Sequence, residues 1–277
     1  MLSTRHLSYR YQDEDDYALN DINVDIANGQ VVGILGANGS GKSTLFMNLL
    51  GVLKPTQGTV LQDNLPLQYD KTSLRQLRQR VSMVFQDPDQ QIFYSDINSE
   101  LAFTLRNLGY AEDEINQRIE RVLDLVDARS FRHKPIQYLS YGQKKRIAIA
   151  GALMLESECL LLDEPTAGLD PGGREHMITT IEKITQQGTR VMISSHDIDL
   201  IYQISDYLYV LKQGSILIDG ETERVCLQTE LMEQAGLTQP WLVKLHLRLG
   251  IPLFKNEQQL FNAGLSFKSA FNAGDTG

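Results

Sequence analysis

The chain of 277 residues has 35 acidic and 26 basic side chains, a net charge of −9, and 42% hydrophobic residues. This length suits one large domain or a domain with a small appendage, and the acidic balance argues against nonspecific nucleic-acid binding. The sequence has no apolar run long enough to span a bilayer, no signal-peptide core at its N-terminus and only two cysteines, so we expect a cytoplasmic protein without a disulfide framework.

The N-terminal part of the chain predicts short strands and two helices. Strands are expected at 5–12, 22–30, 31–36, 58–62 and 80–86, and a helix at 41–53 follows the continuous apolar strand 31–36. A basic cluster lies in a second predicted helix, where a solvated helix face is its simplest explanation: Lys71, Arg75, Arg78 and Arg80.

From about residue 87 to 155 the pattern is mostly helical. One helix, at 113–126, carries its apolar residues on a single face: Ile115, Ile119, Val122, Leu123 and Val126. Strands return at 159–164, 189–195, 206–212 and 215–220, around a helix at 172–185. Buried strands alternating with helices are typical of an α/β fold with a mostly parallel sheet, so the stretch 87–155 is expected to be a helical insertion on that core.

The chain changes character after Gly220. Two short amphipathic helices are expected at 229–237 and 239–250, the second with Trp241, Leu242, Leu245 and Leu249 on one face. The polar end of the chain is expected to fray. We therefore predict a main domain at 1–220, whose helical subdomain spans about 87–155, and a C-terminal helical extension at 221–277, which is either a packing appendage or an oligomer contact.

The stretch GANGSGKS matches the pattern G-x-x-x-x-G-K-[ST] between a buried strand and a helix start, as a phosphate-binding loop requires. Glycines let backbone N–H groups surround a phosphate, and the helix N-terminus adds a favourable field. Lys42 can reach the β- and γ-phosphates, and the Ser43 hydroxyl can bind Mg²⁺. The predicted nucleotide site consists of Gly36, Ala37, Asn38, Gly39, Ser40, Gly41, Lys42, Ser43 and Thr44.

A second chemical element is the apolar strand CLLLDE, which ends in two carboxylates. Asp163 would hold Mg²⁺ directly or through water, and Glu164 would polarise the attacking water. Two adjacent acids at a strand end could instead be ordinary turn residues. Their occurrence together with the phosphate-binding loop favours the catalytic role.

Six motifs in order resemble the ATP-binding cassette family: the loop at 36–43, Gln86 after a strand, LSYGQ at 139–143, LLLDE at 160–164, AGLD at 167–170 and SSH ending at His196. The resemblance covers roughly residues 2–220. It implies an ATPase that uses Mg²⁺, with a P-loop core, a mostly parallel sheet, a small antiparallel β subdomain and a helical insertion.

The resemblance also implies a role for LSYGQ, which looks like a helix start prepared for an anion although the chain already has a phosphate loop. Two copies would pack head to tail, so that Ser140, Tyr141, Gly142 and Gln143 of one contact the ATP held by the other. ATP would then close the dimer, and hydrolysis would reopen it. Where the family usually has a glycine, this chain has Tyr141, for which we expect a helix-like backbone.

Further roles follow from the same resemblance. Tyr11 is expected to stack on adenine, with Tyr9 and Tyr17 as alternatives and a core role open for all three. Gln86 would sense Mg²⁺ and the attacking water, so Ser43, Gln86 and Asp163 form the expected magnesium site. Asp170 would lie at the dimer seam, and His196 would contact the γ-phosphate. The expected catalytic residues are Lys42, Gln86, Glu164 and His196.

Several longer stretches narrow the resemblance to the energy-coupling-factor branch of importers, and within it to the ATPases of cobalt importers: VFQDPDQQIF, SSHDIDLIYQISDYLYVL and AGLTQPWLVKLH. This implies ATP-driven uptake of cobalt for cobalamin synthesis, at the inner face of the cell membrane. The implied partners are a transmembrane scaffold subunit and a substrate-capturing membrane protein. Because every catalytic position is intact, we expect a homodimer with two competent sites.

Several alternatives remain open from the sequence alone. The segment 86–109, with Phe93 and Tyr94, is a candidate docking surface for the membrane subunit, although packing within the insertion would explain it as well. Nickel or a vitamin could replace cobalt as the cargo. A cassette ATPase of DNA repair or translation is disfavoured, because the sequence has no long heptad run and no CxxC motif.

Overall fold

Six strands form the central sheet of the computed structural model, which describes residues 1–12 and 14–264. In sheet order they are β10 (Ser215–Glu221), β9 (Tyr207–Lys212), β3 (Val31–Leu35), β8 (Arg190–Ser195), β7 (Cys159–Asp163) and β6 (Val81–Val84). All neighbours are parallel except β9 and β10, which confirms the predicted α/β fold with a mostly parallel sheet. The carboxyl ends of the parallel strands meet at one edge, where ligand-binding loops of such sheets begin.

Successive residues of the central strands enter two different cores. Leu160 and Leu162 of β7 pack with the core that contains the helices of the insertion, whereas Leu161 between them joins the core shared with the second sheet. The same alternation separates Val191 and Ile193 from Met192 in β8. Because the sheet is covered on both faces, its strands are continuous apolar runs rather than alternating ones.

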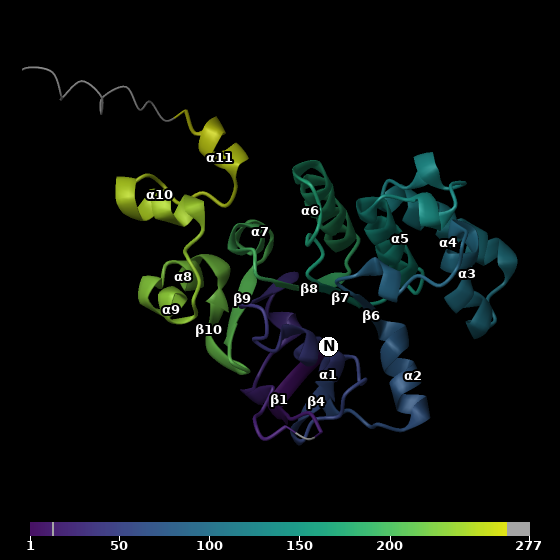
Figure 1. The fold of residues 1–277 in the computed structure, drawn as a ribbon, viewed down its shortest axis with the longest axis horizontal. Coiled ribbons are helices and arrows are strands. Elements are labelled where there is room, and N and C mark those ends of the chain that lie inside the picture. The colour runs from purple at the N-terminus through teal and green to yellow at the C-terminus, as the bar shows by residue number, and fades with distance from the viewer. Residues whose placement is uncertain (13, 265–277) are drawn as a thin grey trace, which may run out of the picture.

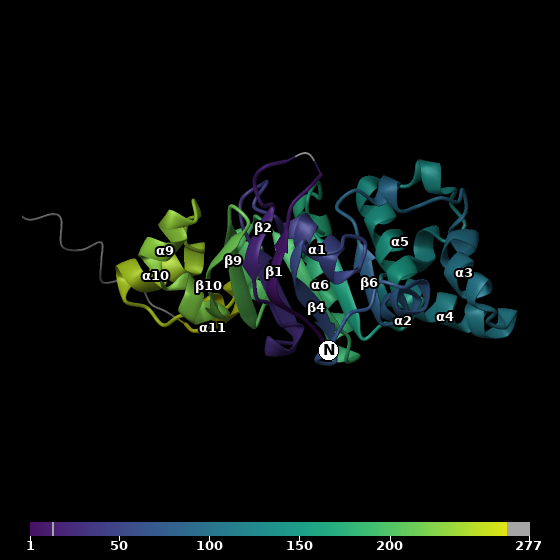
Figure 2. The ribbon, with the colours of Figure 1, turned by 90° about the horizontal axis from the view of Figure 1, so that it is seen from below.

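The second sheet is antiparallel and has the order β2 (Leu19–Ile22), β1 (Leu2–Tyr9), β4 (Gln57–Gln62) and β5 (Leu65–Pro66). Helix α1 (Lys42–Leu49) packs its buried side chains into the core between the two sheets, and Figure 2 shows it beside β1 and β4. This arrangement matches the expected small antiparallel β subdomain and places the start of α1 at the carboxyl edge of β3.

Two N-terminal strands were predicted at the wrong positions. The first strand begins at Leu2 rather than at residue 5, and the second is Leu19–Ile22 rather than 22–30. Residues Ile26–Asn28 form a 3-10 turn instead, because the Asp25 side chain accepts a hydrogen bond from the Ala27 N–H and draws the backbone out of the extended conformation.

The insertion lies at one end of the molecule and contains α3 (Ile97–Leu108), α4 (Glu112–Leu125) and α5 (Tyr141–Leu153), while α2 (Lys71–Arg80) lies next to β6 (Figure 1). The five apolar residues predicted on one face of the helix at 113–126 are all buried, four within α4 and Val126 directly after it. Helices α6 (Pro171–Gln186) and α7 (Ile198–Ile204) contribute Met177, Ile178 and Leu200 to the larger core.

The C-terminal helices lie at the opposite end of the molecule in both views: α8 (Thr222–Cys226), α9 (Thr229–Gln234), α10 (Trp241–Leu249) and α11 (Glu257–Asn262). The predicted apolar face of α10 is wrong at its end, since Leu242 is buried but Leu249 is 58% exposed. Gly250 has a left-handed backbone that ends the helix there. The residues predicted to fray lie mostly outside the described residues. No helix of the described part of the chain combines the length and apolarity that a bilayer crossing requires.

Candidate functional site

The phosphate-binding loop runs from Gly36 to Gly41 between β3 and α1, and its glycines are required by its shape. Gly39 and Gly41 have φ values of +79° and +106°, which favour glycine. A Cβ atom on Gly36 would lie 2.5 Å from the Ser40 Oγ, so no side chain fits there. Such a backbone can turn consecutive N–H groups toward one anion at the start of a helix.

Lys42 is buried at the first position of α1 and points back over this loop. Its Nζ donates hydrogen bonds to the carbonyl oxygens of Gly36, at 2.8 Å, and Ala37, at 3.2 Å. The same ammonium lies 3.3 Å from the Glu164 Oε1. Two loops that are distant in the sequence therefore bring the lysine and the glutamate of the predicted site together.

Two buried oxygen atoms of this site have no hydrogen-bond partner within the described residues: the Ser40 Oγ and the Glu164 Oε1. The Lys42 ammonium near Glu164 is close enough for charge attraction but does not satisfy that oxygen as a hydrogen-bond donor. Because buried polar atoms are normally paired, these two fit a polar ligand such as a phosphate with its attacking water.

Asp163 ends β7 and Glu164 follows it, both with buried side chains, and the neighbouring strand β8 holds both through hydrogen bonds. The Ser194 hydroxyl donates to the Asp163 Oδ1, and the Glu164 N–H donates to the Ser194 carbonyl oxygen and Oγ, each at 3.1 Å. Sequence reasoning did not identify Ser194. Its place as the first residue of the SSH motif was the available signal, and the structure sets it opposite Asp163 in the sheet register.

His196 follows β8 and contacts the carboxylate of Glu164. Its Nδ1 lies 2.9 Å from the Glu164 Oε2, which also accepts a longer hydrogen bond, 3.4 Å, from the Ser195 hydroxyl. The glutamate side chain is 7% exposed and that of the histidine 54%. The loops after β3, β7 and β8 thus assemble three of the four predicted catalytic residues into one cluster, whose members are Lys42, Glu164 and His196.

Gln86, the fourth predicted catalytic residue, is exposed after β6. Within residues 1–12 and 14–264, no hydrogen bond joins its side chain to Ser43 or Asp163. Oxygen ligands of Mg²⁺ need no hydrogen bonds to one another, so the expected Mg²⁺ site of these three residues stays a prediction. Its backbone carbonyl accepts a hydrogen bond from the Tyr141 hydroxyl at 3.1 Å. Gln86 is therefore connected to the LSYGQ segment.

Among the three candidate tyrosines for adenine stacking, Tyr11 is bonded to the P-loop helix. Its hydroxyl lies 3.0 Å from the Thr44 Oγ1, its side chain is 40% exposed, and its ring packs edge-on against Tyr9. The Tyr17 hydroxyl accepts a hydrogen bond from Gln57 instead. An exposed ring anchored to α1 favours Tyr11 for stacking on a base.

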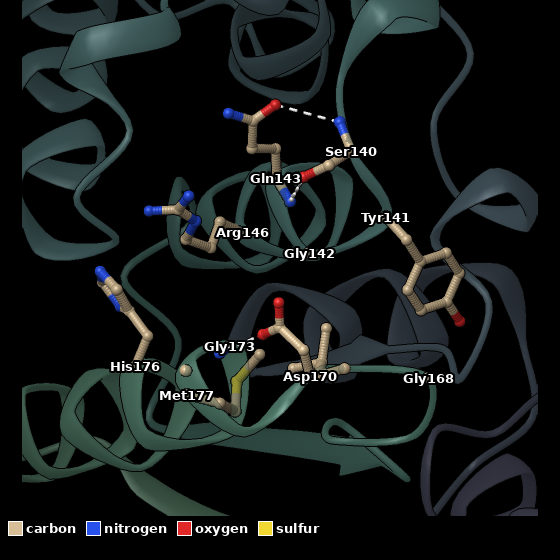
Figure 3. Close-up of a pocket in the computed structure, with 12 residues that line it drawn as sticks. Ser140, Tyr141, Gly142, Gln143, Arg146, Gly168, Asp170, Gly173, His176 and Met177 are labelled. Atoms are coloured by element: carbon tan, nitrogen blue, oxygen red, sulfur yellow. Dashed lines mark hydrogen bonds between the residues drawn. The ribbon is translucent and has the colours of Figure 1, made fainter.

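The LSYGQ segment begins α5 with a capping box. The Gln143 N–H donates to the Ser140 Oγ at 3.3 Å, and the Ser140 N–H donates to the Gln143 Oε1 at 3.0 Å (Figure 3). Tyr141 is the first residue of this helix, which confirms its predicted helix-like backbone. The sequence LSYGQ thus forms a firmly capped helix start.

A hollow of about 500 Å³ separates the starts of α5 and α6. It is lined by Ser140, Tyr141, Gly142, Gln143, Arg146, Gly168, Leu169, Asp170, Gly172, Gly173, His176 and Met177. Figure 3 shows the Asp170 side chain between the two helices, where it accepts a hydrogen bond from the Gly173 N–H at 2.7 Å. No lining residue belongs to the phosphate-binding loop, so the predicted anion contacts of α5 lie apart from the cluster around Lys42.

Comparison with known proteins places this geometry in a family. The family model described as ABC transporter matches residues 19–167. The cobalt import ATP-binding protein CbiO of Salmonella paratyphi A is 60% identical over 262 residues, which are 95% of this chain and 96% of the relative. The energy-coupling factor transporter ATP-binding protein EcfA of Methanocaldococcus jannaschii is 41% identical over 240 residues, covering 87% and 86% of the two chains.

Solved structures are similar over most of the chain. CbiO1 of Clostridium perfringens, described as part of the ABC transporter complex cbiONQ, has a TM-score of 0.77 and 38% identity, covering 90% of this chain and 95% of its own. A dimeric ATP-binding cassette in a post-hydrolysis state with ADP and phosphate has a TM-score of 0.71 and 27% identity, covering 80% and 99%. The chain therefore belongs to the ABC transporter family, as an ATP-hydrolysing ATP-binding protein of the energy-coupling-factor type.

Proposed function

We propose that this chain powers the uptake of cobalt ions for cobalamin synthesis, as the ATPase of a membrane importer. The observation that carries the ATPase part is the cluster in which the buried Glu164 contacts both Lys42 and His196 beside the phosphate-binding loop. The 60% identity to a cobalt import ATP-binding protein supports cobalt as the cargo, ahead of nickel or a vitamin.

In the proposed mechanism, the chain's own residues divide the work on bound ATP. The loop from Gly36 to Thr44 and the Lys42 ammonium hold the phosphates, and Tyr11 stacks on the base. Glu164 accepts the proton of the attacking water, and His196 orients the γ-phosphate beside it. Mg²⁺, which Ser43, Asp163 and Gln86 would hold, supplies positive charge at the phosphates.

We further propose that two copies of the chain form the working ATPase. The anion contacts of α5 lie apart from the chain's own phosphate loop, so Ser140, Tyr141, Gly142 and Gln143 would bind ATP held by the second copy. Asp170 would lie at the seam between them. Both ATP sites would be competent for hydrolysis, and the assembly would be a homodimer. An obligate second cassette subunit in the purified complex would contradict this.

The proposed membrane partners are a transmembrane scaffold subunit and a substrate-capturing protein, which would hold the chain at the inner face of the membrane. The division into a main domain at 1–220 and an extension at 221–277 belongs to the same proposal. The segment 86–109 is the proposed docking surface, since Phe93 is 79% exposed and Tyr94 packs on the exposed ring of Phe103.

The test of this function is uptake of cobalt and nickel by cells that express the chain with its membrane partners. Glu164→Gln removes the proton acceptor while keeping the size of the side chain, so cobalt uptake should fall to background. The purified variant should also elute as a dimer with MgATP in gel filtration, because ATP persists between the two copies.

Wild-type chain and the exposed variant Lys183→Met serve as controls for expression and folding. Nickel uptake that depends on Glu164 would keep the mechanism and replace the cargo. If neither metal depends on Glu164, the cobalt proposal is wrong and vitamin uptake is the next assay. A variant that stays monomeric with MgATP would contradict the role given to α5.

A further inference from the structure

Lys145 is a buried lysine for which the proposed ATPase chemistry has no use. It lies on α5, and its side chain is 1% exposed. The ammonium donates hydrogen bonds to the main-chain carbonyl oxygens of Glu164 and Pro165, both at 2.9 Å. Burial lowers the pKa of Lys145 to about 8, against the opposing influence of Glu164 and Asp163. Because burying an ammonium is costly, its two directed bonds indicate a specific role.

The backbone that Lys145 binds is itself in a strained conformation. Glu164 has a φ of +46°, which costs a non-glycine residue about 1–3 kcal/mol unless its surroundings hold it in place. Ser194 holds the amide side, since the Glu164 N–H donates to its carbonyl oxygen and hydroxyl. On the carbonyl side, the Glu164 oxygen accepts from the Ala167 N–H and from Lys145. Lys145 and Ser194 are thus the side chains that fix the two ends of this residue.

The strained backbone determines where the Glu164 carboxylate lies. One oxygen is 3.3 Å from the Lys42 ammonium and the other 2.9 Å from the His196 Nδ1. A rotation of the main chain at Glu164 would move the carboxylate out of this arrangement. Misplacing a reacting group by about 1 Å can cost on the order of 10²-fold in rate.

Lys145 also belongs to the helix that begins with the LSYGQ segment. Tyr141 precedes it by one helical turn on the same face, and the Lys145 Nζ lies 5.5 Å from the centroid of that ring. The Tyr141 hydroxyl donates to the Gln86 carbonyl oxygen, so the first turns of α5 contact both the Gln86 segment and the Glu164 backbone.

We propose that Lys145 is a positioning residue for Glu164 and ties this glutamate to the helix whose N-terminus serves the ATP of the second copy. The inference rests on the proposed function, in which Glu164 activates water and α5 acts across the dimer. A displacement of α5 as the dimer closes is transmitted to the main chain of Glu164 and Pro165 through two buried hydrogen bonds. Helix α5 therefore couples closure at the ATP site of the second copy to the position of Glu164 in its own chain.

The experiment compares Lys145→Met with wild type in steady-state ATP hydrolysis by the purified full-length chain. Methionine has a similar length and volume but no donor. We expect kcat to fall about tenfold to a hundredfold, whereas KM for ATP stays within about twofold because other residues hold the phosphates. Each rate is divided by the concentration of nucleotide-binding sites, which a nucleotide-binding titration measures. Unfolded chain, which binds no nucleotide, then does not lower the apparent kcat. Lys145→Gln, which keeps a donor, should recover part of the lost kcat.

Matched variants separate the possible outcomes. Lys183→Met makes the same replacement at an exposed position of α6 and should behave as wild type. Glu164→Gln should abolish hydrolysis in the same assay, and if it does not, the proposed function itself fails. If Glu164→Gln is inactive while Lys145→Met keeps its kcat, the inference about Lys145 is wrong. The inference is equally wrong if Lys145→Met changes kcat and KM together and Lys145→Gln recovers no more activity than Lys145→Met.

Discussion

The lysine at position 145 and the glutamate at position 164 are both buried, but the groups that surround their charged ends differ. Glu164 has two basic neighbours for its carboxylate, namely Lys42 and His196. Among the described residues, the hydrogen-bond partners of the Lys145 ammonium are neutral carbonyl oxygens. Carbonyl dipoles compensate a charge less than a carboxylate does, which is why burial dominates and the pKa of Lys145 falls.

This difference predicts how stability depends on pH. The pKa of Lys145 is about 8 in the folded chain and about 10.4 when unfolded, so between these values the unfolded state binds more protons. The free energy of unfolding attributable to this residue therefore rises with pH across that window. Relative to Lys145→Met, wild type should gain on the order of 2 to 3 kcal/mol from pH 8 to pH 10. Urea unfolding of both proteins at several pH values measures this, and a constant difference would contradict it.

At the scale of elements, the starts of α5 and α6 are fitted to each other through one side chain. The Tyr141 ring lies so close to Gly168, in the turn before α6, that a Cβ atom there would come within 3.0 Å of its Cε1. The family resemblance places a glycine where this chain has Tyr141, and a glycine would leave this contact open. The tyrosine therefore adds a contact between the LSYGQ segment and the turn that leads to Asp170.

Gly168→Ala should disturb this contact and lower both stability and hydrolysis. The φ of +75° alone should cost about 1 kcal/mol or somewhat more, and the clash with Tyr141 adds to it. Gly188→Ala is the matched control, because Gly188 has a φ of +94° but a Cβ atom there would meet no atom of the described chain within 4 Å. Thermal unfolding should show a larger loss at 168 than at 188.

The same two alanine substitutions, made in the variant Tyr141→Gly, measure the contribution of the Tyr141 ring. In Tyr141→Gly, the two alanine substitutions should cost about the same, since only the backbone penalty remains. Equal losses at both glycines in the wild-type background would show that the ring moves aside without cost.

At the scale of the whole molecule, the insertion and the C-terminal helices occupy opposite ends of the sheet (Figure 1). Each end exposes aromatic side chains: Phe93 and Tyr94 before α3, and Phe261, which is 72% exposed, on α11. The first pair adjoins the segment of Gln86, whose carbonyl is bonded to α5. A partner bound there would touch the part of the chain that leads to the ATP sites.

Substitution of Phe93 and Tyr94 by alanine should therefore weaken assembly with the membrane subunit at least tenfold, because buried aromatic residues often dominate interface energies. Co-purification from membranes and a titration of the soluble chain measure the effect. Phe261→Ala removes a similarly exposed ring at the far end and should leave assembly unchanged. Normal assembly of the Phe93 and Tyr94 variant, with normal stability, would rule out this segment as the docking surface.

The sequence predicted local structure well where the signal lies within a few neighbouring residues. The α/β fold, the helix after Gly41 and the negative φ of Tyr141 are confirmed for this reason. Long-range contacts were not predictable: Lys145 lies 19 positions before the carbonyl it binds, and Ser194 is 31 positions after Asp163. Such pairs depend on sheet register and helix packing. The strand expected at 22–30 failed because one Asp25 hydrogen bond outweighed the apolar pattern.

The ion pair between Lys42 and Glu164 has a consequence for the order of events in a turnover. A phosphate that approached Lys42 would compete with a carboxylate already beside it, so nucleotide entry would be an exchange of anionic partners rather than a simple addition. In the proposed mechanism, the glutamate released from the lysine would then be free to accept a proton from the attacking water. Nucleotide binding would then also free the glutamate for its proposed role. A ligand too short to reach Lys42 would leave Glu164 paired with the lysine.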